Sequence, residues 1–290
     1  MSLAIEASPT EAISLDITDD EFERIGAMVY RHCRIRLGEG KRALIRARLA
    51  KCLRESGVHD VGAYLAHVAA DKTGREFSRL IDSISTNLTS FFRERNHFIY
   101  LEKQVLPKMF EAKRAAHSNR IRIWSAGCST GEEPYSLAMM MLEALAGREG
   151  WDVKILGTDI SRRVLRIAKA GSFDPAHVRL APEPFRGKYF RPARRTGEAG
   201  GYVVPEVRDL VTFRYLNLID SWPFKGPFDF IFCRNVMIYF DADTQQNLVN
   251  RFWEVLAPGG HLMTGHSESL NGMTHKFKYV EPTVYRKELA

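Results

Sequence analysis

The sequence has few cysteines, no histidine cluster and no long apolar run. Its four cysteines, Cys33, Cys52, Cys128 and Cys233, are widely scattered, and none forms a CxxC pair. Because no Cys or His residues have ligand spacing, we expect no metal site, and we expect a reduced protein of the cytoplasm. No apolar segment approaches the roughly 20 residues that span a bilayer, so we expect no membrane insertion.

The first seventeen residues lack the features of a signal peptide. They mix Glu6, Glu11 and Asp16 with small residues, and they have neither a basic start nor an apolar run. We therefore expect residues 1–17 to be a disordered tail. With 290 residues, of which 45% are hydrophobic, the chain is long enough for two domains with ordinary packed cores.

Acidic residues are almost absent from residues 31–54, although the net charge of the whole chain is only +7. This stretch holds nine Lys or Arg and one acid, Glu39. Four of these cations lie on the helix predicted there: Arg46, Arg48, Lys51 and Arg54. They form either a solvated basic face or a surface for an acidic partner.

The apolar spacing is helical from Thr18 to about Phe110, and strands alternate with helices after the polar HSNR break. The predicted strands are IRIWS, VKILGTD, VTFRYLNL, FDFIFCRN and HLMTG, and the predicted helices span 132–146, 161–170 and 243–256. This alternation predicts an α/β fold, with a mostly parallel sheet between two layers of helices. The tail FKYVEPTVYRK predicts an antiparallel hairpin at the sheet edge.

Residues 173–209 interrupt the alternation. Several prolines, and a TGEAGG turn between YFRPARR and YVVPEV, predict a small inserted β-subdomain. We place the N-terminal helical domain at residues 18–88 and the sheet domain, with its insertion, at residues 89–290.

The stretch IRIWSAGCSTGEEPYS, residues 121–136, lacks the GxGxxG pattern, which argues against a dinucleotide oxidoreductase. Small residues such as Ala126 and Gly127 let a ligand approach the strand end, but they also make tight corners. Cys128, with no base nearby, is expected to be a small buried thiol. The next strand ends in Asp159, where a carboxylate can accept both ribose hydroxyls of a nucleoside.

Glu132 and Glu133 stand at the helix start, where a diphosphate would need positive potential. Two carboxylates there repel a phosphate and attract a cation. A ligand with a nucleoside and a positive centre but no phosphate is S-adenosylmethionine. Acids are also favoured in the first turn of any helix, so both interpretations stay open here.

Two further segments carry polar residues among apolar ones. In STNLTSFFRE, residues 85–94, Asn87, Thr89 and Arg93 are expected to face a cleft, although a capped helix start also explains the first two. Their apolar neighbours are expected to anchor the segment: Leu88, Phe91 and Phe92. IFCRNVMIYFD, residues 231–241, places three polar side chains at the carboxyl end of the sheet: Arg234, Asn235 and Tyr239.

Six motifs occur in the order of a known family: NLTSFFRE, WSAGCSTGEEPYS, TDIS, NL, FDFIFCRNVMIYF and GHSE. Over residues 18–287 they resemble the CheR-type chemoreceptor glutamate methyltransferases. The resemblance implies a class I S-adenosylmethionine-dependent methyltransferase sheet, a helical N-terminal domain and an inserted β-subdomain. It also implies S-adenosylmethionine, bound between the two domains, as the cofactor, and S-adenosylhomocysteine as the product.

The resemblance also implies the residues of the site. Those expected around the cofactor are Asn87, Thr89, Arg93, Ala126, Gly127, Glu132, Glu133, Asp159 at the ribose, Asn217 and Leu218 by the adenine, Cys233, Arg234 and Asn235. Those expected near the transferable methyl group are Arg93, Arg234 and Tyr239.

The implied reaction is methyl transfer to glutamate side chains on the cytoplasmic helices of a bacterial chemoreceptor. A Glu with a pKa near 4.3 is already the nucleophile at pH 7, so orientation is the main task. The guanidiniums of Arg93 and Arg234 are expected to position the incoming carboxylate. Tyr239 is expected to place that carboxylate or to line the methyl channel, since its ordinary pKa near 10 makes it a poor base.

Receptor methylation regions are rich in Glu and Gln, so the basic residues of the predicted helix are expected to bind an acidic helical bundle of the receptor. In some family members the β-subdomain adds a receptor's C-terminal peptide as an extra strand, whereas here the RRTGEAGGYVV segment can also be a plain hairpin. We expect a monomer that binds no nucleic acid.

Two other functions compete with this one. A nucleic-acid methyltransferase is disfavoured because no Pro-Pro-aromatic segment follows the fourth strand and no exposed aromatics accompany the basic helix. A non-catalytic S-adenosylmethionine-binding adaptor is disfavoured because Arg93, Arg234 and Tyr239 are all present.

Overall fold

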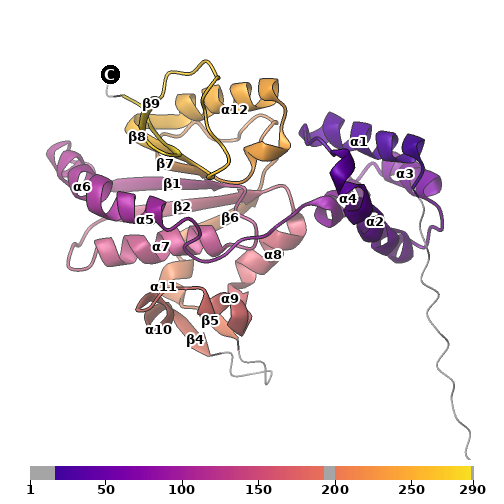
Figure 1. Cartoon of the computed structure of the whole chain (residues 1–290). Helices are drawn as coiled ribbons and strands as arrows, with labels where there is room; N and C mark the ends of the chain where they lie inside the picture. The colour runs from indigo at the N-terminus through magenta and orange to yellow at the C-terminus, as the bar shows by residue number, and fades with distance from the viewer. Residues whose placement is uncertain (1–16, 193–199, 289–290) are drawn as a thin grey trace, which may run out of the picture. The chain divides into compact units, whose positions relative to one another are not determined.

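A computed structural model describes residues 17–192 and 200–288 (Figure 1). The predicted disordered tail, up to residue 16, and the TGEA of the TGEAGG turn lie outside the described residues. Ile17, which we assigned to the tail, is instead buried at 7% exposure. The chain divides into two compact units: Met1–Tyr30 with Leu37–Ile84, and Arg31–Arg36 with Ser85–Ala290.

The first unit is helical, as predicted. Its elements are α1 (Asp19–Cys33), whose last residues group with the second unit, the 3-10 turn η1 (Glu39–Lys41), α2 (Arg42–Ser56), α3 (Val61–Ala70) and α4 (Arg75–Ile84). Thr18 and Glu21 form a capping box at the start of α1, in which each side chain accepts the backbone N–H of the other residue. The apolar stripe predicted on α2 is buried: Ile45, Leu49 and Cys52.

The second unit contains a seven-stranded sheet of order β6-β2-β1-β7-β8-β10-β9. Its strands are β1 (Arg120–Ala126), β2 (Asp152–Asp159), β6 (Val211–Tyr215), β7 (Phe228–Cys233), β8 (Leu256–Thr264), β9 (Lys278–Glu281) and β10 (Val284–Arg286). The first five pair in parallel, and β10 is antiparallel to both β8 and β9. The α/β fold and the C-terminal edge hairpin are confirmed.

Helices cover both faces of this sheet (Figure 1). They are α5 (Asn96–Tyr100), the π-helical turn η2 (Leu101–Val105), α6 (Leu106–Ala115), α7 (Glu132–Ala144), α8 (Arg162–Ala170) and α12 (Ala242–Val255). One apolar cluster contains side chains of the helices from α5 through α8 together with Ile123 and Ile155 of the sheet. A second cluster contains side chains of α12 together with Trp124 and Ile231 of the sheet. Because neighbouring residues of a strand point to opposite faces, the two clusters lie on opposite sides of the sheet.

The insertion is less β-rich than predicted. It has a three-stranded sheet of order β3-β5-β4 and three short helices. The elements are β3 (Ser172–Phe173), α9 (Pro175–Arg179), α10 (Phe185–Tyr189), β4 (Phe190–Pro192), β5 (Gly201–Val203) and α11 (Pro205–Arg208). Two of the prolines that we took as turn signals, Pro175 and Pro205, begin helices, because the fixed φ of proline suits the first helical position.

The register brings the carboxyl ends of four strands to one edge of the sheet. Ala126 pairs with Thr158, Ser125 with Phe232, and Cys233 with Thr264. In an open α/β sheet this edge is where ligands bind. In the ranges 17–192 and 200–288, no helix is long and apolar enough to cross a membrane.

Candidate functional site

The turn after β1 is tied to the end of β2. The Ser129 N–H donates to Asp159 Oδ2 at 2.8 Å, and the Ser161 N–H donates to Asp159 Oδ1 at 2.9 Å. Gly127 has φ +86°, and a Cβ built there would lie 2.3 Å from a methyl carbon of Val236. Gly127 therefore leaves space for Val236 in the loop after β7, whereas we had expected it to leave space for a ligand.

Residues 85–90 cross this turn outside any helix or strand, and Phe91 and Phe92 then form a turn of their own. No helix begins between Ile84, where α4 ends, and Asn96, so the helix-capping interpretation of Asn87 and Thr89 is wrong. The Asn87 carbonyl accepts a hydrogen bond from Ser129 Oγ at 3.0 Å, whereas its buried Nδ2 has no partner among the described residues. An unpaired buried amide is unusual in a folded protein, and it points to a missing acceptor.

The apolar residues of this segment behave differently from one another. Phe91 and Phe92 are buried, and the Phe91 ring packs against Phe173 and Phe190 of the insertion, with centroids 4.9 and 5.0 Å away. Leu88 is 79% exposed, which corrects our prediction that it anchors the segment. The extended backbone sends Leu88 outward, because successive side chains of an extended chain point to opposite sides.

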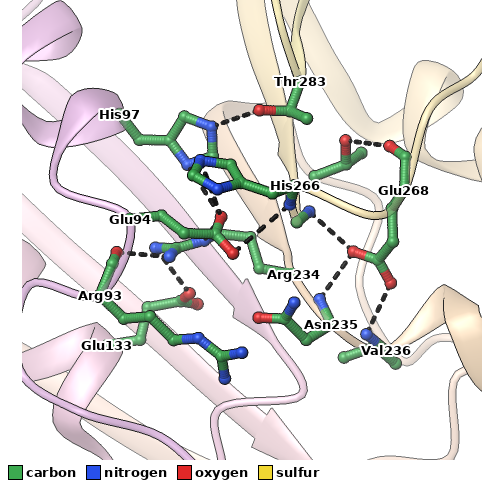
Figure 2. Close-up of polar contacts among 12 residues, drawn as sticks. Arg93, Glu94, His97, Glu133, Arg234, Asn235, Val236, His266, Glu268 and Thr283 are labelled. Carbon is green, nitrogen blue, oxygen red and sulfur yellow. Dashed lines mark hydrogen bonds and ion pairs between the residues drawn. The ribbon is translucent and has the colours of Figure 1, made fainter.

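Arg234 is enclosed by two carboxylates (Figure 2). Its Nε lies 3.2 Å from Glu94 Oε2, and its Nη1 lies 3.3 Å from Glu133 Oε2, while Nη2 donates to the Arg93 carbonyl. The Arg234 side chain is only 2% exposed. In this arrangement Arg234 cannot receive a substrate carboxylate, so the structure favours a structural role over the positioning role that we expected.

The charges of this cluster are set by burial and by Arg234. Burial raises the pKa of Glu133, although Arg234 and a 2.6 Å hydrogen bond from Ser125 Oγ oppose it. For Glu94 burial also acts upward, but Arg234 and the His266 N–H outweigh it and hold the pKa below its usual range. Burial, helped by Arg234, lowers the pKa of His97 to about 4, so that ring is neutral at pH 7.

Arg93 remains the accessible cation of the predicted pair. Its Nη1 donates to the Leu88 carbonyl at 2.7 Å, and in Figure 2 its guanidinium points away from the linked carboxylates. Tyr239 closes the 3-10 turn η3 (Met237–Tyr239), which follows β7, and it is partly exposed.

Glu132 does not join Glu133, although the two are adjacent. Its Oε2 accepts from Thr130 Oγ1 at 2.6 Å, and its Oε1 lies 3.4 Å from His177 Nδ1 of the insertion. Glu132 therefore faces the insertion, because neighbouring residues of a helix point about 100° apart. We remove it from the candidate cofactor residues.

Three predicted cofactor residues have buried side chains with other partners. Asn217 Nδ2 donates to the His32 carbonyl at 2.8 Å, and both residues belong to the second unit. Leu218 and Cys233 belong to the apolar cluster beneath α12, and burial raises the pKa of the Cys233 thiol. The Cys128 thiol is buried, as predicted, and its pKa is likewise raised by burial.

Two acids that our sequence reasoning left without a role are central to the site. Glu94 holds Arg234, and Glu268 accepts backbone N–H groups from the loop after β7. Each is the last residue of a motif that carried the resemblance, NLTSFFRE for Glu94 and GHSE for Glu268. For Glu268, a carboxylate soon after the end of β8 was the available signal.

The basic residues of α2 differ in their surroundings within the first unit. Arg46 and Arg54 are exposed, and Lys51 Nζ lies 3.8 Å from Glu55. Arg48 is partly buried, and its Nη1 donates to the Ile84 carbonyl at 2.9 Å, the last residue of α4. Arg48 therefore contributes to the fold of the unit itself. The described ranges contain no group of three His, Cys, Asp or Glu residues able to hold a metal ion.

The sheet order, with an antiparallel strand beside β8, and the site at the carboxyl ends define a class I S-adenosylmethionine-dependent methyltransferase. The site fits this cofactor, because the buried Asn87 amide lacks an acceptor among the described residues and the Asp159 carboxylate lies beside the turn after β1. The family described as "CheR methyltransferase, SAM binding domain" matches residues 87–286, and "CheR methyltransferase, all-alpha domain" matches residues 20–85.

Curated proteins match over most of the chain. A chemotaxis protein methyltransferase of Borreliella burgdorferi is 40% identical over 95% of this chain and 96% of its own length. One of Escherichia coli is 39% identical over 93% of this chain and 92% of its own length. The chain belongs to the CheR methyltransferase family, and its cofactor is S-adenosylmethionine.

Proposed function

We propose that the protein transfers the methyl group of S-adenosylmethionine to glutamate side chains of bacterial chemoreceptors, giving glutamate methyl esters and S-adenosylhomocysteine. The match of both family domains, and of chemotaxis protein methyltransferases over almost the whole chain, carries this proposal. The substrates are glutamates on the receptor's cytoplasmic helices, and the enzyme acts in the cytoplasm as a monomer.

Asn87, Glu133 and Asp159 hold the cofactor. The Asn87 Nδ2, which has no partner among the described residues, donates to it, and the Asp159 carboxylate at the end of β2 accepts ribose hydroxyls. Glu133 adds a buried negative charge that favours a cationic ligand. When bound, S-adenosylmethionine supplies a methyl group on a positively charged sulfur.

Arg93 and Tyr239 orient the substrate. A glutamate carboxylate is ionised at pH 7 and needs no general base, so the residues around it have to hold its oxygen in line for attack. The Arg93 guanidinium donates to a backbone carbonyl, and it forms a charge-assisted hydrogen bond with that carboxylate when the substrate is bound. Arg234 acts through Glu133 and the Arg93 backbone.

The test uses methyl-labelled S-adenosylmethionine with receptor-containing membranes of the source bacterium. After the reaction, base treatment releases labelled methanol from a carboxyl methyl ester, and an amine or nucleic-acid product retains its label. We expect base-labile counts that are lost in Arg93→Gln and retained in Arg95→Gln, a variant of an exposed arginine two residues away.

Two outcomes would reverse the proposal. Calorimetric binding of S-adenosylmethionine without base-labile counts from any receptor favours the non-catalytic adaptor. Base-stable label recovered in nucleic acid added to the same reaction favours a nucleic-acid methyltransferase.

Two surfaces are proposed for the receptor. The exposed cations of α2 dock an acidic helical bundle, and the edge strand β4 of the insertion accepts a receptor's C-terminal peptide as an additional strand. Titration of such a peptide in a calorimeter tests the second surface. Absence of heat at high micromolar peptide concentrations would remove it.

A further inference from the structure

The turn Gly265–Glu268, which contains the GHSE motif, has no role in the function proposed above. Its last residue, Glu268, is 5% exposed, and its carboxylate accepts four backbone N–H groups. Figure 2 shows those from Asn235 and Val236. Oε2 accepts from Asn235 at 2.6 Å and from Gly265 at 2.7 Å. Oε1 accepts from Val236 at 2.8 Å and from Ile238 at 3.2 Å.

Glu268 is itself held in place. Its N–H donates to the Gly265 carbonyl at 2.8 Å, and its carbonyl accepts from Thr264 Oγ1 at 2.6 Å. A Cβ at Gly265 would lie 2.8 Å from both Asn235 N and Glu268 Oε2. Only glycine therefore lets the ends of β7 and β8 approach closely enough for one carboxylate to bind both.

The loop held by Glu268 carries the residues predicted near the methyl group. It leaves β7 at Arg234, passes through Asn235 with φ +58°, and ends in Tyr239. A positive φ is uncommon outside glycine, so it needs partners that fix it. The same turn is also linked to Arg234 through Glu94. The His266 N–H lies 3.4 Å from Glu94 Oε1, and Glu94 pairs with Arg234.

We propose that Glu268 is a positioning residue for methyl transfer. Its carboxylate fixes the backbone of residues 235–238, and that backbone sets where Tyr239 meets the substrate. Glu268 lies behind the loop and acts through it. The proposal rests on the proposed function, because it assumes that the loop after β7 faces the reacting groups.

Glu268→Gln tests this role because it preserves size and removes the charge. An amide offers one acceptor oxygen, and its NH2 group faces N–H donors, so at least two of the four hydrogen bonds are lost. We expect kcat for receptor methylation to fall about 10- to 100-fold, as an orientation defect does. The dissociation constant for S-adenosylhomocysteine should change little, because Asn87, Glu133 and Asp159 are untouched.

The matched control is Glu143→Gln in α7. Glu143 accepts a 2.6 Å hydrogen bond from the Tyr189 hydroxyl and pairs with Lys188, remote from the loop after β7. This variant should lower stability while leaving kcat unchanged. Two further variants, Glu268→Asp and Gly265→Ala, retain the negative charge but disturb its approach to Asn235, and they should also lower kcat in folded protein.

The outcomes separate the two proposals. If wild-type protein gives no base-labile counts, the proposed function fails and this inference fails with it. If wild-type protein is active and the folded Glu268→Gln variant has wild-type kcat, only the role of Glu268 is overturned. The positioning role is also overturned if the loss in kcat only follows the folded fraction of each variant. It is overturned likewise if all three variants at positions 265 and 268 fail to fold, because Glu268 then has a structural role.

Discussion

Glu133 and Arg234 form a buried ion pair, with Glu133 Oε2 lying 3.3 Å from Arg234 Nη1. The two side chains come from α7 and from the end of β7, and they are 14% and 2% exposed. Glu94 pairs with the same guanidinium from the opposite end, so one cation balances two carboxylates. Arg234 thus joins segment 85–94 to the sheet.

Replacing Arg234 with Ala should strongly destabilise the protein. Glu94 and Glu133 would be left buried without a counter-ion, and breaking a buried pair in this way costs about 3–5 kcal/mol. Urea denaturation at pH 7 measures this loss. Arg186→Ala is the control, because Arg186 pairs with Glu183 at the surface and should contribute less than about 1 kcal/mol. A loss below about 1 kcal/mol for Arg234→Ala would contradict the bridging role.

Arg93→Gln should have the opposite profile, losing activity and keeping stability. We expect kcat/KM for the receptor to fall about 10- to 100-fold, because the substrate carboxylate loses a charged donor. The loss of the hydrogen bond to the Leu88 carbonyl should change the free energy of unfolding by about 1 kcal/mol. Steady-state kinetics with receptor membranes, and urea denaturation, measure the two quantities. An active Arg93→Gln variant would exclude Arg93 from the site.

Much of the fold follows from local sequence patterns. Near-continuous apolar strands that alternate with helices specify a parallel sheet, and caps such as Ser161 and Asp241 begin the helices where the pattern predicts. The helices of the insertion were missed because proline signals both turns and helix starts, as at Pro175.

The site was harder to predict, because side-chain partners come from distant parts of the chain. Arg234 meets Glu94, 140 residues earlier, and Glu268 meets Asn235 through its backbone. No local pattern encodes such pairs. The sequence predicted a cationic site residue at Arg234 but not the two carboxylates that pair with its guanidinium.

Asn87→Ala should weaken cofactor binding without weakening the fold. The Asn87 Nδ2 has no partner among the described residues, so its removal leaves the free energy of unfolding unchanged or slightly higher. One lost hydrogen bond of about 1–1.5 kcal/mol should raise the dissociation constant of S-adenosylhomocysteine about tenfold. Calorimetry measures this constant, with Asn96→Ala, an exposed amide nearby, as the control. Unchanged affinity would remove Asn87 from the cofactor site.

Mild acid should destabilise the second unit through two buried histidines. Burial lowers the pKa of both His97 and His261 to about 4, with neighbouring arginines acting in the same direction. The unfolded chain, with a His pKa near 6.5, then binds protons that the folded chain does not. Stability is therefore complete above pH 6.5 and falls as the pH drops towards 4, by up to roughly 3 kcal/mol for each histidine.

Urea denaturation between pH 7.5 and 4.5 measures this slope of stability against pH. His97→Gln should make the slope shallower, because a neutral amide takes the place of the ring that bonds Thr283 Oγ1. His59→Gln, at an exposed position, should leave the slope unchanged. An identical slope in His97→Gln and in wild-type protein would show that His97 is not responsible.

Reversing the exposed charges of α2 should weaken receptor binding in a salt-dependent way. Arg46→Glu and Arg54→Glu replace attraction for an acidic bundle with repulsion, and salt screens both effects within about 8–10 Å. We expect a loss of affinity at low salt that shrinks as salt rises, with kcat unchanged at saturating receptor. Arg48→Glu should instead lower stability, because Arg48 bonds the Ile84 carbonyl at the end of α4. Arg31→Glu and Arg75→Glu, two exposed cations outside α2, control for net charge. Equal losses from these controls would mean that net charge, and no particular face of α2, attracts the receptor.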